Sequence, residues 1–233
     1  MENQVVTQSP EGSGGLALSG LYRVIFSPVD FFNDLKKNPK ILVPYLFLIV
    51  ILLLSFFTLK DLILDQQIAA MAEQGQLDNA PENIRQIMMI TTAIGMVLYA
   101  ILGPLVIAAL GYMFGNMLTD NKVSFMAVLS VAIFGEMLFS LTGLIMIPIM
   151  LAKGTMMASL SPAILVADQG MESFMYVLLS KISLFHIWEI IVVGIGLSVF
   201  YEVPRNKGYI LSVLSVGMVS IIHVVIAGVK SIM

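Results

Sequence analysis

Long apolar stretches alternate with short polar ones along most of the chain. A helix needs roughly 20 mainly apolar residues to cross a hydrocarbon core that is about 30 Å thick. Five stretches reach that length, at residues 41–59, 87–117, 125–151, 174–200 and 209–233. The pattern therefore predicts an all-α polytopic membrane protein, built as a bundle of five transmembrane helices.

The composition agrees with this prediction and excludes the soluble classes. Of the 233 residues, 58% are hydrophobic and only 12% are charged, whereas soluble domains carry about 25% charged residues. So few charges could not cover a water-soluble surface. The net charge of −3 does not suit nucleic-acid binding, which needs a basic excess. The sequence has no cysteine, so disulfides, thiolate metal sites and cysteine nucleophiles are excluded as well.

The Lys and Arg residues between the predicted spans indicate an orientation, because such residues accumulate on the cytoplasmic side of a membrane. With the N-terminus in the cytoplasm, the inner segments hold seven of them, namely Arg23, Lys36, Lys37, Lys40, Lys122, Arg205 and Lys207. The outer segments hold four, namely Lys60, Arg85, Lys153 and Lys230. We therefore expect a cytoplasmic N-terminus and, because five is an odd number of spans, a C-terminus outside.

Two kinds of segment precede the first predicted span. Residues 1–19 are polar and contain a run of Ser, Gly and Pro, which predicts a disordered cytoplasmic tail. The next stretch contains a helix-start signal followed by an aromatic pair, at Ser27, Pro28, Phe31 and Phe32. An amphipathic helix over residues 27–37, lying at the cytoplasmic interface and offering a contact surface, explains this pattern. A plain positive flank before the span explains only the lysines.

Residues 20–233 are predicted to form one five-span membrane domain. Its largest polar insertion lies at about residues 60–86, where the first helix continues, breaks near Gly75 and restarts toward the second span. This pattern predicts a helical hairpin that projects outward. Such a hairpin could bind a partner or serve as a spacer.

Ionisable residues inside the predicted spans are the main candidates for function, because they are costly in a membrane. Four of them share one layer near the midplane, about 17–21 Å from the inner ends of their spans at a rise of about 1.5 Å per residue, namely Glu136, His186, Glu189 and His223. His186 and Glu189 stand at i and i+3 and face the same side of a helix. Lys181 lies nearer the outer surface, toward which its side chain can extend.

Three interpretations of this polar layer stay open. It could be a buried network in which Glu136 bonds His223 or His186 and locks the helices together. It could be a proton or ion relay, since a histidine beside a carboxylate suits proton transfer near neutral pH. It could also hold a divalent metal (zinc, iron or manganese) between two imidazoles and two carboxylates. That metal is the only cofactor that the sequence suggests.

A small-residue pair lies in the second predicted span. Gly111 and Gly115 form a GxxxG pattern in an apolar helix, which favours close packing between helices. That packing could lie within one chain or between two copies, so the pair could also support an oligomer.

Two segments resemble a known family: LYRVIFSPVDFF at residues 21–32 and LFHIWEIIVVGIGLSVFYEVPRNKGY at residues 184–209. The first resembles the N-terminal motif of the YIP (Ypt-interacting protein) domain family, in which an aromatic-Ser-Pro unit precedes a short helix. The second resembles that family's fourth span and the turn after it. The resemblance covers about residues 20–230 and implies a five-helix membrane protein. The long outer hairpin is more similar to prokaryotic members than to eukaryotic ones.

The resemblance implies a function through protein contacts, because no catalytic residues are established for the family and its eukaryotic members are linked to Rab-type GTPases and vesicle traffic. We therefore expect a non-enzymatic protein with a scaffold or membrane-organising role in a prokaryotic cytoplasmic (inner) membrane. Its expected partners are the lipid bilayer and membrane or cytoplasmic proteins. The alternative is a small ion- or metal-coupled transporter that uses Glu136, His186, Glu189 and His223.

Overall fold

All the regular secondary structure in the computed structural model is helical over the described residues, which are 15–39, 41–156 and 160–230. Within these ranges, five helical segments are long and apolar enough to cross a membrane, namely α3 (Leu42–Glu73), α4 (Ile84–Leu118), α5 (Phe125–Lys153), α7 (Leu184–Tyr201) and the continuous stretch Arg205–Lys230. The predicted all-α architecture with five spans is confirmed.

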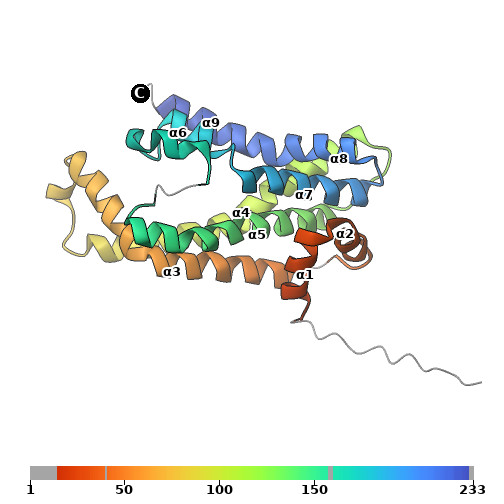
Figure 1. Ribbon diagram of the computed structural model, residues 1–233, viewed down its shortest axis with the longest axis horizontal. Helices are drawn as coiled ribbons and strands as arrows, with labels where there is room; N and C mark the ends of the chain where they lie inside the picture. Colours follow the sequence, from red (N-terminus) through yellow and green to blue (C-terminus); the bar gives the residue numbers. More distant parts are fainter. Residues whose placement is uncertain (1–14, 40, 157–159, 231–233) are drawn as a thin grey trace, which may run out of the picture.

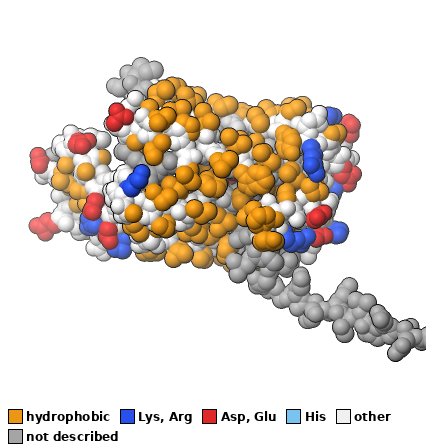
Figure 2. Space-filling model, viewed as in Figure 1, with side chains coloured by type: hydrophobic (Ala, Val, Ile, Leu, Met, Phe, Trp, Pro, Cys, Tyr) orange, Lys and Arg blue, Asp and Glu red, His pale blue; other side chains and the backbone are white. Residues whose placement is uncertain are grey.

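The long helices run roughly along one direction, and α5 is the central one (Figure 1). It packs against α3, α4 and α7. Every residue of α5 from Ala127 to Leu138 is buried, as expected for a helix that is apolar on all sides. The face of the bundle shown in Figure 2 is mainly apolar between two charged ends, and a hydrocarbon core would cover this apolar belt.

The polar segment after the first span forms a helical hairpin at one end of the bundle (Figure 1). α3 runs on into this segment, and Gly75 turns the chain with a φ of +67°, a conformation that suits glycine. After the short helix η1 (Leu77–Asn79), α4 returns to the bundle. Arg85 ties the two arms together by donating to Asp61 at 3.1 Å and to Asp65 at 2.6 Å.

The fourth span, predicted over residues 174–200, is not one helix. It consists of α6 (Phe174–Ser180) and α7, separated by residues 181–183. Ser183 caps α7, since its Oγ accepts a hydrogen bond from the backbone N–H of His186 at 3.1 Å. The apolar character continues across the break and no Gly or Pro marks it, so the hydropathy pattern could not reveal it.

α6 runs antiparallel to the last helix, α9 (Met218–Lys230). Phe174 at the start of α6 lies against Gly228, whereas Lys181, just after α6, lies 3.5 Å from His223. α6 therefore enters the bundle from the hairpin end, and the break that follows it lies inside the bundle.

The fifth span begins at Arg205 rather than at residue 209, and its middle is irregular. α8 (Arg205–Ser212) passes into a π-helical turn, η3 (Val213–Gly217), before α9 begins. The start of the span is held by a close approach, because Gly208 lies directly against the backbone of α7. A side chain at this position would collide with α7.

The GxxxG pair on α4 packs inside the chain. Gly111 and Gly115 are both buried, and the Tyr201 ring at the end of α7 fills the space beside Gly115. The Tyr201 hydroxyl donates to the Gly111 carbonyl oxygen at 3.4 Å. The surface through which Gly111 and Gly115 could join two copies is therefore already occupied by the same chain.

The chain becomes helical earlier than predicted at its N-terminal side. Residues 1–14 of the predicted tail lie outside the described residues, whereas residues 15–19 belong to α1 (Gly15–Phe26). α2 (Pro28–Lys37) follows, where the sequence predicted an amphipathic helix. Ser27 precedes α2, but its side chain does not make the predicted capping bond. Both helices lie at the end of the bundle opposite the hairpin (Figure 1).

Candidate functional site

The four residues of the predicted polar layer line one cavity inside the bundle. Its volume is about 30 Å³, which is room for roughly one water molecule. Glu136 comes from α5, His186 and Glu189 come from α7, and His223 comes from α9. The structure thus brings together side chains from three different spans.

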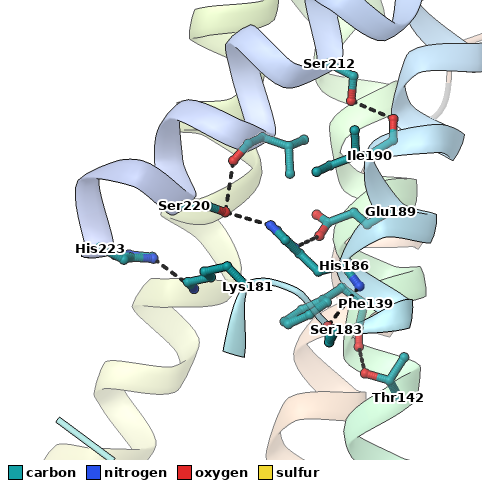
Figure 3. A network of polar contacts seen from close by, with 11 residues as sticks. Phe139, Thr142, Lys181, Ser183, His186, Glu189, Ile190, Ser212, Ser220 and His223 are labelled. Atoms are coloured by element: carbon teal, nitrogen blue, oxygen red, sulfur yellow. Dashed lines mark hydrogen bonds and ion pairs between the residues drawn. The ribbon is translucent and has the colours of Figure 1, made fainter. Parts of the chain in front are cut away.

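His186 is the centre of a hydrogen-bonded chain (Figure 3). Its Nδ1 lies 2.9 Å from Glu189 Oε2, and its Nε2 lies 2.7 Å from Ser220 Oγ. Ser220 Oγ in turn lies 3.2 Å from the Val216 carbonyl oxygen. His186, Glu189 and Ser220 are all buried. The i, i+3 spacing on α7 indicated the contact between His186 and Glu189. A serine in an apolar span gave no indication that Ser220 would bond His186.

Lys181 enters the same cavity from the break between α6 and α7 (Figure 3). Its Nζ lies 3.5 Å from Nδ1 of His223. The sequence placed Lys181 nearer the outer surface, toward which its side chain can extend, and the structure places this side chain at the cavity, where it contacts His223. A charge inside an apolar stretch marked Lys181 as a candidate residue of the site. The direction of its side chain could not be predicted, because the sequence indicated one continuous helix at this position.

Glu136 also lines the cavity, from the central helix, and is only 5% exposed. Gly103 on α4 leaves room for it, since a Cβ there would lie 3.3 Å from Glu136 Oε1. Within the described part of the chain, no donor forms a hydrogen bond with this carboxylate. The predicted bonds from Glu136 to His186 or His223 are therefore not formed, and the His186–Glu189 contact is the direct link within the predicted four.

The arrangement does not suit a metal ion. A histidine that binds a metal directs an unprotonated ring nitrogen at it, but both ring nitrogens of His186 are engaged by Glu189 and Ser220. In the residues that the structure describes, no three or more His, Cys, Asp or Glu side chains are grouped so as to hold a metal. The geometry therefore does not support the divalent-metal interpretation.

The aromatic pair of α2 packs on the protein. Phe32 is fully buried, and Phe31 is 6% exposed, with its ring centroid 4.6 Å from that of Phe134 on α5. The prediction that Phe31 and Phe32 offer an exposed contact surface is therefore wrong, because these rings fill the core. The exposed aromatic pair at this end is on α1, where Tyr22 and Phe26 are 65% and 67% exposed and their ring centroids are 4.7 Å apart.

Ion pairs fix α2 to its neighbours. Asp34 accepts from Arg23 of α1 at 2.6 Å and from Lys37 at 3.1 Å, and Lys36 donates to Glu202 at the end of α7 at 2.7 Å. The hydrogen bond from Arg23, and then that from Lys37, holds the pKa of Asp34 below its ordinary value of 3.8. The hydrogen bond from Lys36 likewise lowers the pKa of Glu202. These pairs are exposed, so each contributes little alone.

Five apolar helices around a buried polar layer define an α-helical, multi-pass integral membrane protein. A family model described as the Yip1 domain matches residues 22–228. The chain belongs to this family, which confirms the resemblance seen in its sequence. No curated protein and no solved structure is significantly similar to the chain.

Proposed function

We propose that this Yip1-family protein is a non-enzymatic scaffold that organises other proteins in its membrane through contacts at the α1–α2 end. One observation carries the proposal: α2 is fixed to the bundle by its buried aromatic pair, while its opposite face is exposed. That exposed face is polar and consists of Asp30, Asn33, Asp34 and Lys37. A helix held this firmly loses little conformational freedom when a partner binds, which favours recognition.

The two helices at this end suit different surroundings. Tyr22 and Phe26 of α1 are exposed aromatic side chains, and such rings gather at the headgroup level of membranes. The charged face of α2 suits water and a polar protein surface instead. α1 would therefore rest on the bilayer while α2 faces a protein partner.

The proposal includes an orientation and a membrane. Under the predicted topology, seven of the Lys and Arg residues belong to inner segments of the sequence and four to outer segments, which supports a cytoplasmic α2. The length of the hairpin, which in the sequence resemblance was closer to prokaryotic members, is the reason for proposing a prokaryotic cytoplasmic (inner) membrane. The C-terminus would then lie outside.

The transporter alternative lacks a comparable observation. The cavity has room for roughly one water molecule, and the His186 ring nitrogens are both engaged. We therefore keep the scaffold as the conclusion.

Photo-crosslinking in cells tests this function. A photoreactive residue at Asn33 on the exposed face of α2 is expected to give an adduct of defined mass with another protein. The matched control is Gln76, which is exposed on the hairpin turn at the other end and is expected not to give that adduct. Asp30→Lys, an exposed charge reversal on the same face, is expected to weaken it. The absence of an adduct at Asn33, or the same adducts from both positions, would contradict the proposal.

A further inference from the structure

Irregular backbone from two spans meets at the polar cavity. The break at residues 181–183 brings Lys181 into it, and the π-helical turn η3 contributes Val216. Non-helical backbone at membrane depth is tolerated where it lines a cavity or is enclosed in protein, and π-helical turns are frequent at functional sites. The fold therefore departs from regular helix where the ionisable side chains meet.

The charges that face the cavity do not balance without a proton. Two carboxylates, Glu136 and Glu189, face one ammonium group, Lys181. With both histidines neutral, the sum is one negative charge in a space that admits roughly one water molecule. A net charge in the membrane interior is costly, and the uptake of one proton makes the cavity neutral.

Neutral groups complete the surroundings of the cavity. Tyr99 of α4 and His223 of α9 line it. Tyr45 of α3 is engaged elsewhere, since its hydroxyl donates to the Ile101 carbonyl oxygen at 3.1 Å. Neither phenol changes the sum of charges.

The hydrogen-bonded chain through His186 has two arrangements that differ by one proton. Ser220 has a single hydroxyl proton and two acceptors within reach, His186 Nε2 at 2.7 Å and the Val216 carbonyl oxygen at 3.2 Å. If the hydroxyl donates to Nε2, the Nδ1–H donates to the Glu189 carboxylate and the chain carries one negative charge. If the hydroxyl turns to Val216, Nε2 must carry a proton and donate to Ser220. The added proton then makes the His186–Glu189 pair neutral overall.

We propose that this cavity is a proton-binding site, in which the His186–Glu189 pair holds the proton and Glu136 is the second carboxylate that makes uptake favourable. A rotation of the Ser220 hydroxyl accompanies uptake, so the contacts of the chain are kept in both states. The ligand is the proton alone.

The site exchanges protons with the hairpin side of the membrane. The polar groups that continue from the pair toward the hairpin side are Lys181 and His223, which are in contact. His223 lies seven residues before Lys230, about 10 Å along the axis of α9. Toward the opposite end, the residues of α7 that follow the pair are buried in the core, among them Val192, Val193 and Leu197. Access is therefore one-sided, which separates a proton-binding site from a channel.

Proton uptake by the full chain in lipid nanodiscs tests the proposal. Between about pH 5.5 and 9, where exposed carboxyl groups stay ionised, Glu189→Gln and Glu136→Gln are each expected to bind about one proton fewer per chain than the wild type. The control, Glu82→Gln, removes an exposed carboxylate of the hairpin and is expected to leave uptake unchanged. Unchanged uptake in both cavity variants would overturn the proposal.

Ser220→Ala keeps the test decisive if a glutamine variant does not fold. It retains both carboxylates but removes the hydroxyl that bonds His186 Nε2. The midpoint of proton uptake is expected to fall by about half a pH unit or more, since the charge-assisted bond from protonated Nε2–H to Ser220 is stronger than the neutral bond of the other state by on the order of 1 kcal/mol. An unmoved midpoint would count against the role of the chain.

The side of access can be read from Trp188, the single tryptophan, which precedes Glu189. In proteoliposomes its fluorescence is expected to follow the pH on the hairpin side and not on the other side. Because the chain has no cysteine, Gln76→Cys labelled with an impermeant maleimide identifies the hairpin side. A response to pH on the α1–α2 side, or a sustained proton flux through the protein, would refute one-sided access.

Discussion

Tyr201 at the end of α7 occupies the space beside Gly115 on α4, and its hydroxyl reaches the carbonyl oxygen of Gly111. A methyl group at position 115 would overlap the Tyr201 ring. We expect Gly115→Ala to destabilise the bundle by roughly 1–3 kcal/mol, measured by unfolding in detergent. Gly95→Ala on the same helix is the control, because nothing lies within 4 Å of its added Cβ. Equal stability of the two variants would show that the close packing of Tyr201 against Gly115 does not contribute to the stability of the bundle.

Phe32 joins α2 to the bundle. Its side chain is fully buried and lies against Gly196 of α7. Phe32→Ala is expected to cost roughly 3–5 kcal/mol through lost burial and a cavity. Phe26→Ala, which removes a ring that is 67% exposed, is expected to cost much less in the same unfolding assay. A reversed order would mean that α2 is not held by its aromatic face.

His186 and Ser220 are expected to be energetically coupled, because their polar atoms lie 2.7 Å apart in a buried site. A double-mutant cycle with His186→Ala and Ser220→Ala is expected to give a coupling energy of about 0.5–3 kcal/mol. The control cycle pairs His186 with Ser198, twelve residues further along α7, and is expected to be additive within about 0.5 kcal/mol. Additivity in the first cycle would remove the basis for a hydrogen-bonded chain.

The ion pair between Arg23 and Asp34 predicts a pH dependence of stability. The pKa of Asp34 is lowered in the folded protein, so its contribution is present above its ordinary pKa of 3.8 and is lost as the pH falls through the folded value. The melting temperature of Asp34→Asn is therefore expected to lie below that of the wild type at neutral pH. The difference is expected to vanish in acid. A difference that persists there would indicate a structural role unrelated to ionisation.

The absence of cysteine allows the topology to be tested with single-cysteine variants. An impermeant maleimide is expected to label Gln76→Cys on the hairpin in intact cells, and to label Asn33→Cys on α2 only after the membrane is permeabilised. Both positions are exposed, so neither reaction is limited by burial. The opposite labelling pattern would reverse the proposed orientation.

The sequence predicted the polar layer, but not its connections. Glu136, His186, Glu189 and His223 shared a depth because residue number along a helix converts directly into distance. Lys181 and Ser220 joined the layer only in the folded chain. A break without Gly or Pro turns Lys181 inward, and the packing of α9 against the bundle places Ser220 beside His186.

By itself, the sequence determined that this is a five-span, all-α membrane protein of the YIP type, with a hairpin after the first span and ionisable groups near the midplane. These properties depend on runs of neighbouring residues, which is why they can be read locally. The tertiary structure decided that the GxxxG pair accepts Tyr201, that the aromatic face of α2 is core, and that the polar side chains share a cavity. Each of these depends on which helix faces meet, and that is settled by packing between residues far apart in the chain.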